Sequence, residues 1–185
     1  DGVPYDPRLS RRLLAELGYG EPGSLRIVYK TSTDPVRVRL ATVIQRQLAE
    51  IGIDVELRSY DWGTFYGDIK AGNFQMYSLS WVGVKLPEIF RYAFHSASLP
   101  PDGANRGFFV SAAADRLIEE AEAAPALAGQ IEPLRSLQRR LLDELPYAPL
   151  WYEDQVFVAR ADIEGYRLAA DGNYDSLARV SRVAP

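Results

Sequence analysis

Residues 76–87 form the segment of this chain whose pattern is most typical of a ligand-binding site. An apolar run ends there at Trp81 and Gly83, and Pro87 then begins a helix. Ligand pockets of α/β proteins form at the ends of such strands. The rigid Trp81 ring, which has an apolar body and a polar N–H, could therefore form the wall of a pocket. A place in the hydrophobic core is the alternative for this ring.

Other residues that could do chemistry lack the partners that the chemistry needs. The one histidine, His95, is next to Ser96, but sequence neighbours rarely direct their side chains to a common point, so a structural or surface histidine is predicted. The string from Gly18 to Gly23 matches Gly-x-Gly-x-x-Gly, yet it follows a helix instead of a strand, and Pro22 removes an amide that a phosphate would use. With no cysteine, a metal site would need clustered carboxylates, and none is spaced like a calcium loop. We therefore expect no enzyme activity, no metal site and no cofactor.

The overall composition is that of a globular domain. The chain has 185 residues, 47% of them hydrophobic and 25% charged, so it is long enough to bury one core. Its net charge is −4, and acidic and basic residues are interspersed without a basic stripe that would attract phosphate backbones. No nucleic-acid partner is expected. The absence of cysteine suits an oxidising compartment.

Hydrophobic periodicity and helix-capping residues predict an α/β fold. Strands are expected over residues 25–31, 53–59 and 74–82, and the last is apolar enough to be a central strand buried on both faces. Helices are expected over residues 7–17, 35–51, 62–71, 87–94, 111–123 and 131–145, with Pro133 in the first turn of the last. Residues 97–107 are predicted to be a surface loop, and residues 148–160 a long strand or a bent pair. Strands that alternate with helices predict a parallel sheet.

Short motifs follow this order of elements along nearly the whole chain. They are Tyr5-Asp6-Pro7, Ile44 to Leu48 with Gly52-Ile53-Asp54-Val55, Asp61-Trp62 with Phe65, Gly72-Asn73-Phe74, Trp81-x-Gly83, Asn105-x-Gly107, Asp115-x-Leu117 and the stretch from Pro146 to Tyr152. Each motif alone is degenerate, and their succession is what is specific. By this succession the chain resembles the extracytoplasmic solute-binding proteins of family 5, the dipeptide, oligopeptide and nickel-binding components of ABC importers.

The resemblance implies that residues 1–185 form a single α/β lobe, most of the carboxy-terminal lobe of a larger two-lobed protein. The implied fold is the type II periplasmic-binding-protein-like fold, a mixed, mainly parallel sheet flanked by helices. The implied partners are a small-molecule solute, peptide-like or other, the missing amino-terminal lobe of the same chain, and the permease subunits of an ABC transporter. The implied location is periplasmic or extracytoplasmic, with membrane association through the transporter. The alternative is the ligand-sensing domain of a cytoplasmic transcriptional regulator, because the same lobe occurs fused to a helix-turn-helix.

The same resemblance places five residues at the cleft between the lobes: Trp81, Gly83, Val84, Lys85 and Asn105. Peptide-binding members of the family carry an Asp three residues after the pocket Trp, which pairs with the α-ammonium group of the ligand, and another acidic residue before the following Pro. This chain has Val84 and Leu86 there. Because an ammonium group desolvated without its acidic partner costs about 3 to 5 kcal/mol, we expect no ordinary peptide held by its amino terminus. Lys85, if it faces inward, would favour an anionic group, and a solvated lysine is the alternative.

Overall fold

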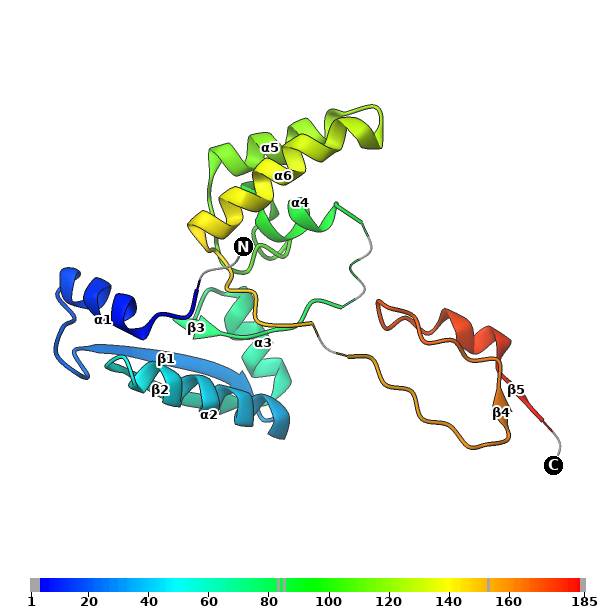
Figure 1. Ribbon diagram of the computed structural model, residues 1–185, viewed down its shortest axis with the longest axis horizontal. Helices are drawn as coiled ribbons and strands as arrows, with labels where there is room; N and C mark the ends of the chain where they lie inside the picture. Colours follow the sequence, from blue (N-terminus) through cyan, green and yellow to red (C-terminus); the bar gives the residue numbers. More distant parts are fainter. Residues whose placement is uncertain (1–3, 83, 85, 153, 184–185) are drawn as a thin grey trace.

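The computed structural model describes residues 4–82, 84, 86–152 and 154–183. Its larger sheet has three parallel strands in the order β2-β1-β3 (Figure 1). Strand β1 (Leu25–Ser32) pairs along its whole length with β2 (Ile53–Tyr60), from Leu25 opposite Ile53 to Ser32 opposite Tyr60. Strand β3 (Met76–Tyr77) pairs with the other edge of β1. The predicted parallel strand–helix–strand arrangement is confirmed.

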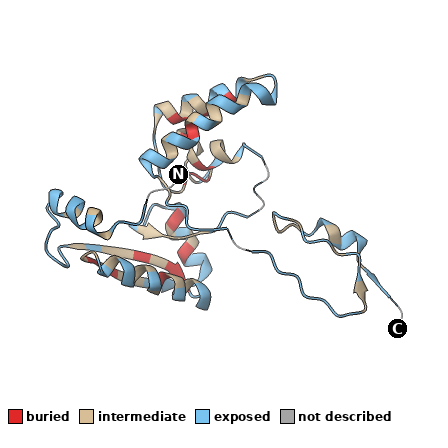
Figure 2. Cartoon of the chain, viewed as in Figure 1, coloured by how far each residue is buried: buried red, intermediate tan, exposed pale blue. Residues whose placement is uncertain are grey.

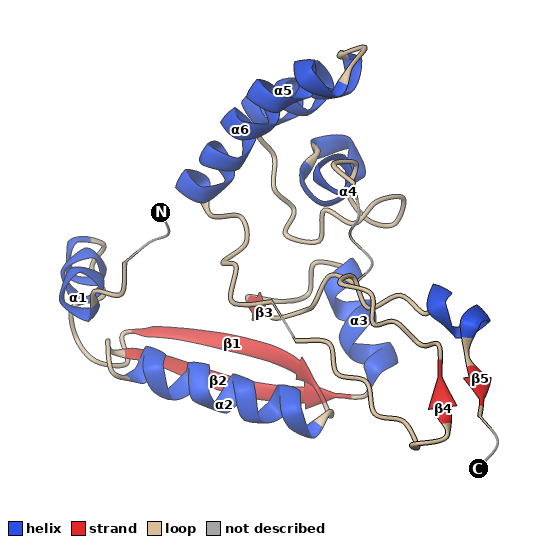
Figure 3. Cartoon of the chain, turned by 45° about the vertical axis from the view of Figure 1, so that its right-hand side comes forward, coloured by secondary structure: helices blue, strands red, loops and turns tan. Residues whose placement is uncertain are grey.

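Three helices begin where capping residues predicted them. Helix α1 (Pro7–Glu16), α2 (Pro35–Ala49) and α3 (Trp62–Lys70) follow Asp6, Asp34 and Asp61, whose carboxylates accept hydrogen bonds from amides of the first turn. Helix α2 packs on β1 and β2, and α3 contacts the same two strands. Side chains of β1 alternate between these helices, since Tyr29 is buried in the cluster below α2 and Lys30 bonds Asp68 of α3 at 2.6 Å. Helices therefore flank the sheet (Figure 3).

The prediction of a central strand over residues 74–82 was wrong. Only Met76 and Tyr77 pair in the sheet, as the edge strand β3, and β1 is the central strand. The segment after Tyr77 leaves the sheet without a strand partner in the described part of the chain. An apolar run shows that a segment can be buried, but a strand also needs a neighbour for its backbone hydrogen bonds.

A helical layer follows the sheet. It consists of α4 (Ile89–Phe94), the 3-10 helix η1 (Ser96–Ser98), α5 (Ala112–Ala123) and α6 (Leu127–Glu144), and α5 packs against α6. Helix α6 begins earlier than predicted, so Pro133 lies inside it and not in its first turn. An internal proline costs a helix about 3 kcal/mol. Burial of Leu137 between α5 and α6 offsets a cost of this size.

Two separate clusters of buried residues replace the one core that was predicted. The first lies between α2 and the sheet around Tyr29 and Val55. The second lies between α5 and α6 around Ile118 and Leu137, and takes in aromatic side chains of α4. Figure 2 shows the buried residues in these two regions. Trp81 lies in the chain segment that connects the two clusters, and its side chain belongs to neither.

The end of the chain extends away from both clusters (Figure 1). Residues 148–160 were predicted to form a strand, but the described ones form none and are mostly exposed (Figure 2). A short antiparallel pair of β4 (Ile163–Glu164) and β5 (Ser181–Arg182) follows, with the 3-10 helix η2 (Asp175–Arg179) between them. The β-branched and aromatic residues of this stretch favour a strand but have no adjacent strand in the described structure. No described helix has the length and apolar character that a membrane span needs.

Candidate ligand-binding site

The carboxyl ends of the three parallel strands meet at one edge of the sheet. The chain leaves β1 toward Asp34 and α2, leaves β2 toward Asp61 and Trp62, and leaves β3 toward Trp81. In open α/β sheets this edge is where ligands bind, because the loops that follow parallel strands converge there. The sequence-predicted Trp81 thus lies beyond a strand end, although that strand is shorter than predicted.

Aromatic and cationic side chains stack in a row across this edge. The guanidinium of Arg37 lies 5.5 Å from the Trp62 ring, which stacks on Tyr66 at 5.5 Å with 8° between the planes. The guanidinium of Arg106 is close to two rings, 5.2 Å from Tyr66 and 5.0 Å from Trp81. Trp81 then meets Tyr92 of α4 edge-on at 6.2 Å. We call this row the cation–ring ladder, and its members are Arg37, Trp62, Tyr66, Arg106, Trp81 and Tyr92.

The cation–ring ladder is accessible to solvent and carries positive charge. Trp62, Trp81 and Tyr92 are 53%, 38% and 48% exposed, so each ring offers apolar surface to a ligand or a partner. Lys70 adds a third cation, 5.2 Å from the Tyr66 ring. Within the described part of the chain, none of the salt bridges involves Arg37, Lys70 or Arg106. Exposed aromatic rings next to cations that form no ion pair with the described residues suit a solute with apolar or planar parts and a negative charge.

Arg106 is held in place by hydroxyl groups as well as by rings. One terminal nitrogen of its guanidinium donates to the Tyr66 hydroxyl at 2.9 Å. The hydroxyls of Tyr77 and Tyr147 interact with each other nearby, and burial raises the pKa of both phenols, so both stay protonated at neutral pH. The positive charge of Arg106 acts on both phenols in the opposite direction, although more weakly than burial. Arg106 therefore faces neutral hydroxyls and rings in place of carboxylates.

Asn105 is a structural residue in this conformation. Its side chain is completely buried, with 0% exposure. The amide nitrogen donates to the carbonyls of His95 at 3.2 Å and Phe109 at 2.6 Å, and the amide oxygen accepts from the Phe109 N–H at 3.0 Å. Gly107 completes the loop, because a Cβ there would lie 2.9 Å from the Tyr147 ring. The Asn105-x-Gly107 motif thus shapes the loop that presents Arg106, and Asn105 itself does not reach the protein surface.

Replacing Asn105 with alanine is expected to destabilise the loop and, through it, the helical layer. Buried backbone groups of His95 and Phe109 would lose their partner, at about 1 to 3 kcal/mol for each group left unpaired. Urea unfolding followed by circular dichroism measures this loss. The exposed Asn73, whose side chain makes no hydrogen bond to described residues, provides the control, and equal stability of Asn105→Ala and Asn73→Ala would contradict the structural role.

Of the three other residues that were predicted to line the cleft, the structure describes one. Val84 is 44% exposed, next to the segment that carries Trp81. Gly83 and Lys85 lie outside the described residues. Arg106, Tyr66 and Arg37 belong to the candidate site but were not among the residues predicted from the sequence. The signal that could have indicated Arg106 is its place inside the Asn105-x-Gly107 motif, whereas its stacking on Tyr66 joins residues far apart in the chain.

His95 and Ser96 do not form a nucleophile and its base. The Ser96 hydroxyl donates to Asp115 at 2.6 Å, and His95 accepts from the Ala97 N–H at 3.0 Å through Nδ1. The other ring nitrogen of His95 lies 3.3 Å from a carboxylate oxygen of Glu119, and the ring is buried. This network joins η1 to α5, so His95 is a structural histidine as predicted. Among the described residues, no cluster of histidine and acidic side chains could hold a metal ion.

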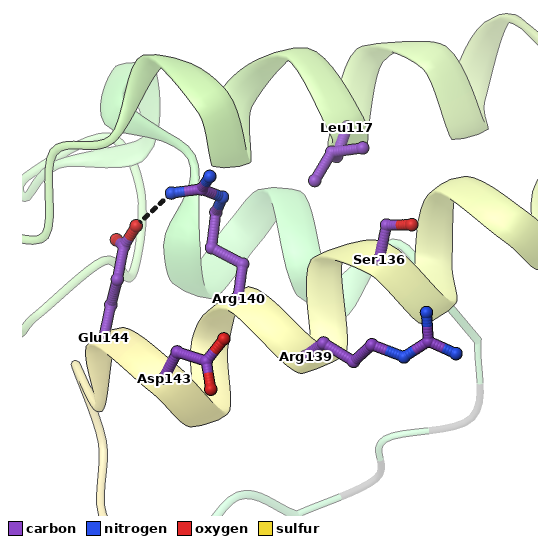
Figure 4. A pocket seen from close by; sticks show the side chains of 6 residues that line it. All are labelled: Leu117, Ser136, Arg139, Arg140, Asp143 and Glu144. Carbon is purple, nitrogen blue, oxygen red and sulfur yellow. Dashed lines mark hydrogen bonds and ion pairs between the residues drawn. The ribbon is translucent and has the colours of Figure 1, made fainter.

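A hollow of about 320 Å³ lies between α5 and α6 (Figure 4), and no residue of a strand lines it. Its lining carries cationic and acidic side chains in equal number, and Arg140 is paired with Glu144 across one turn of α6. The six lining residues are Leu117, Ser136, Arg139, Arg140, Asp143 and Glu144. The hollow contains no aromatic ring and no unbalanced charge, and the cation–ring ladder remains the candidate site.

The chain is similar in sequence to known solute-binding proteins. The family model for bacterial extracellular solute-binding proteins, family 5 Middle, matches residues 1–98. The chain is 28% identical over 169 residues to di/tripeptide-binding protein 2 of Pseudomonas aeruginosa, covering 90% of this chain and 32% of that protein. It is 23% identical over 176 residues to the oligopeptide-binding protein AppA of Bacillus subtilis, covering 88% of this chain and 32% of AppA. The chain thus spans about a third of the length of these curated relatives.

Solved structures agree on the fold. The structure of AppA from Bacillus subtilis in complex with a nonapeptide aligns with a TM-score of 0.86 at 20% identity, covering 100% of this chain and 39% of that one. The periplasmic binding protein DppA from Helicobacter pylori, in complex with the peptide STSA, aligns with a TM-score of 0.82 at 23% identity, covering 97% of this chain and 35% of that one. The predicted type II periplasmic-binding-protein-like fold is confirmed.

Proposed function

Since the chain belongs to the bacterial extracellular solute-binding proteins of family 5, we propose that it forms one wall of the solute site in the substrate-capture component of an ABC importer. The family binds solutes, and the protein acts as a receptor and not as an enzyme. The proposal places the receptor outside the cytoplasm, where it passes its solute to the permease subunits and is membrane-associated through the transporter.

The observation that carries this proposal is the half-exposed Trp81 ring beyond the carboxyl end of β3. A tryptophan in the core would be covered by its own chain. Trp81 instead has Arg106 on one side and the edge of Tyr92 on the other, with more than a third of its surface open. Such a ring offers contact area to a ligand without losing much conformational entropy.

Residues 1–185 are proposed to act as a single lobe of a two-lobed receptor. The coverage of its relatives supports this reading, because the chain spans about a third of their length. A second lobe, supplied by another part of the same chain, would close over the cation–ring ladder and exclude water from it. We propose Trp81, Val84 and, among the residues outside the described structure, Gly83 and Lys85 as the ligand-facing part of this wall. Asn105 supports the wall from behind.

The proposed solute is peptide-like but is not held by an ammonium group at Val84. Relatives of this chain are described as di/tripeptide-binding and oligopeptide-binding proteins. Their common chemistry supports a peptide-like solute here. Val84 and Leu86 offer no charge to a cation, and both side chains are exposed at the position where acidic partners are expected.

We expect the 185-residue chain to bind the physiological solute at least about tenfold more weakly than the two-lobed protein does, a difference of about 1.4 kcal/mol. One wall leaves much of a solute hydrated, whereas two facing walls bury most of it. Native mass spectrometry of the purified two-lobed protein identifies the solute that it retains, and calorimetric titration of both proteins with that solute measures the difference. Equal affinities would show that the site lies within this lobe alone, and a two-lobed protein that retains no solute would contradict the receptor function.

A further inference from the structure

We propose that Arg106 binds a carboxylate group of the solute, so that this receptor selects peptide-like acids by their negative end; the inference rests on the proposed function. The residue lies in the middle of the cation–ring ladder, and no carboxylate of the described chain forms an ion pair with it.

The geometry leaves the hydrogen-bonding edge of Arg106 available. The guanidinium carbon lies 5.2 Å from the centroid of the Tyr66 ring and 5.0 Å from that of the Trp81 ring. Of its five N–H donors, the described side chains accept from one terminal nitrogen, through the Tyr66 hydroxyl at 2.9 Å. The guanidinium is planar, so the remaining N–H donors lie in one plane and can bond both oxygens of a carboxylate.

The surroundings favour an anion over a cation. Arg37 and Lys70 add positive charge to the same ladder. The acidic residues at this edge of the sheet, Asp34 and Asp61, each accept a backbone N–H at the start of a helix. Hydrogen bonds from Thr64 hold the pKa of Asp61 below its usual range, so this carboxylate is already satisfied within its own helix. Among the described residues, the groups shown to interact with Arg106 are the rings of Tyr66 and Trp81, the Tyr66 hydroxyl and the phenols of Tyr77 and Tyr147.

Arg106 is not needed to hold its loop. Three hydrogen bonds of the buried Asn105 side chain fix the backbone on either side of the loop, and the close approach of Gly107 to Tyr147 fixes the far end. A residue with only a structural role at this point could be apolar or neutral. Arg106 forms no ion pair with the described residues and lies close to two partly exposed rings. Closure of a second lobe over it would cost desolvation energy unless the solute supplied an anionic group.

The test compares a matched pair of probes on the two-lobed protein. N-acetyl-Ala-Ala ends in a carboxylate, whereas N-acetyl-Ala-Ala-amide has the same size and ends in a neutral amide; neither has an ammonium group. Titration calorimetry is expected to show that the acid binds at least about tenfold more tightly than the amide, the minimum expected of one charge-assisted bidentate pair. Arg106→Gln should reduce this ratio to about one, and Arg106→Lys should leave an intermediate ratio because lysine keeps the charge without the planar fork.

Arg135→Gln is the matched control, because Arg135 lies exposed on α6 and pairs with Glu132 at 2.8 Å, away from the ladder. It should keep the wild-type ratio, and circular dichroism should show that every variant is folded. Equal binding of acid and amide by the wild type, an unchanged ratio in Arg106→Gln, or failure of the acid to bind would each overturn the inference. The receptor function is judged separately, by whether the two-lobed protein retains a solute in native mass spectrometry.

Discussion

Replacing Trp81 with alanine is expected to weaken solute binding by the two-lobed protein about tenfold or more while leaving the fold intact. The ring is 38% exposed and belongs to neither buried cluster, so most of what it contributes is contact area for a ligand. Its loss would also remove one of the two rings that orient Arg106. Calorimetry with the solute that the wild type retains measures the affinity, and thermal unfolding measures the fold.

The control for this substitution is Leu142→Ala, because Leu142 is 41% exposed on α6 and lies outside the cation–ring ladder. Leu142→Ala should leave the affinity unchanged. If Trp81 were a core residue, its truncation would instead lower the stability by about 3 to 5 kcal/mol. A large drop in melting temperature with the affinity unchanged would therefore show that the ring fills the protein and does not face a ligand.

Replacing Phe65 with alanine should produce the largest loss of stability, about 3 to 5 kcal/mol. Phe65 lies on α3 with 0% exposure, so its removal leaves a cavity where the helix meets the sheet. Urea unfolding followed by circular dichroism gives the free energy of unfolding.

Trp62→Ala is the matched comparison in the same helix, since Trp62 is 53% exposed and contacts Phe65 edge-on at 5.9 Å. Its truncation should cost much less stability than that of Phe65, because water already covers half of the ring. Equal losses for the two variants would mean that Trp62 is part of the core and that the exposed ladder does not exist in solution.

Much of the first half of the fold could be predicted from the sequence because its signals are local. A carboxylate before Pro7 or Pro35 caps a helix through amides two or three residues away, and Gly52, with φ of +94°, lies in the turn that follows the last residue of α2, Ala49. Apolar and polar residues alternate over residues 53–59 because one face of this strand is buried and the other is more exposed. Ile53 and Val55 are indeed buried. Each of these features depends on neighbours in sequence, which a single chain shows directly.

The failures concern features that depend on distant partners. Residues 74–82 and 148–160 have strand composition, but whether a strand forms depends on an adjacent backbone, and the composition of a segment does not reveal its neighbours. Pro133 is tolerated inside α6 because packing against α5 outweighs the local cost, and that packing is a tertiary property. Gly83 and Lys85 lie outside the described residues, so their predicted role remains a prediction.

By itself the sequence determined the family and the α/β class, because these follow from the order of motifs, and it indicated Trp81 as a candidate ligand-binding residue from its place after a predicted strand. Only the tertiary structure decided which residues share the site with Trp81. It buried Asn105 in its own loop and brought Arg106 close to both Tyr66 and Trp81, although Tyr66 lies 40 positions from Arg106. These ring contacts depend on how α3, the segment after β3 and the loop before α5 pack together. A local sequence pattern does not predict that packing.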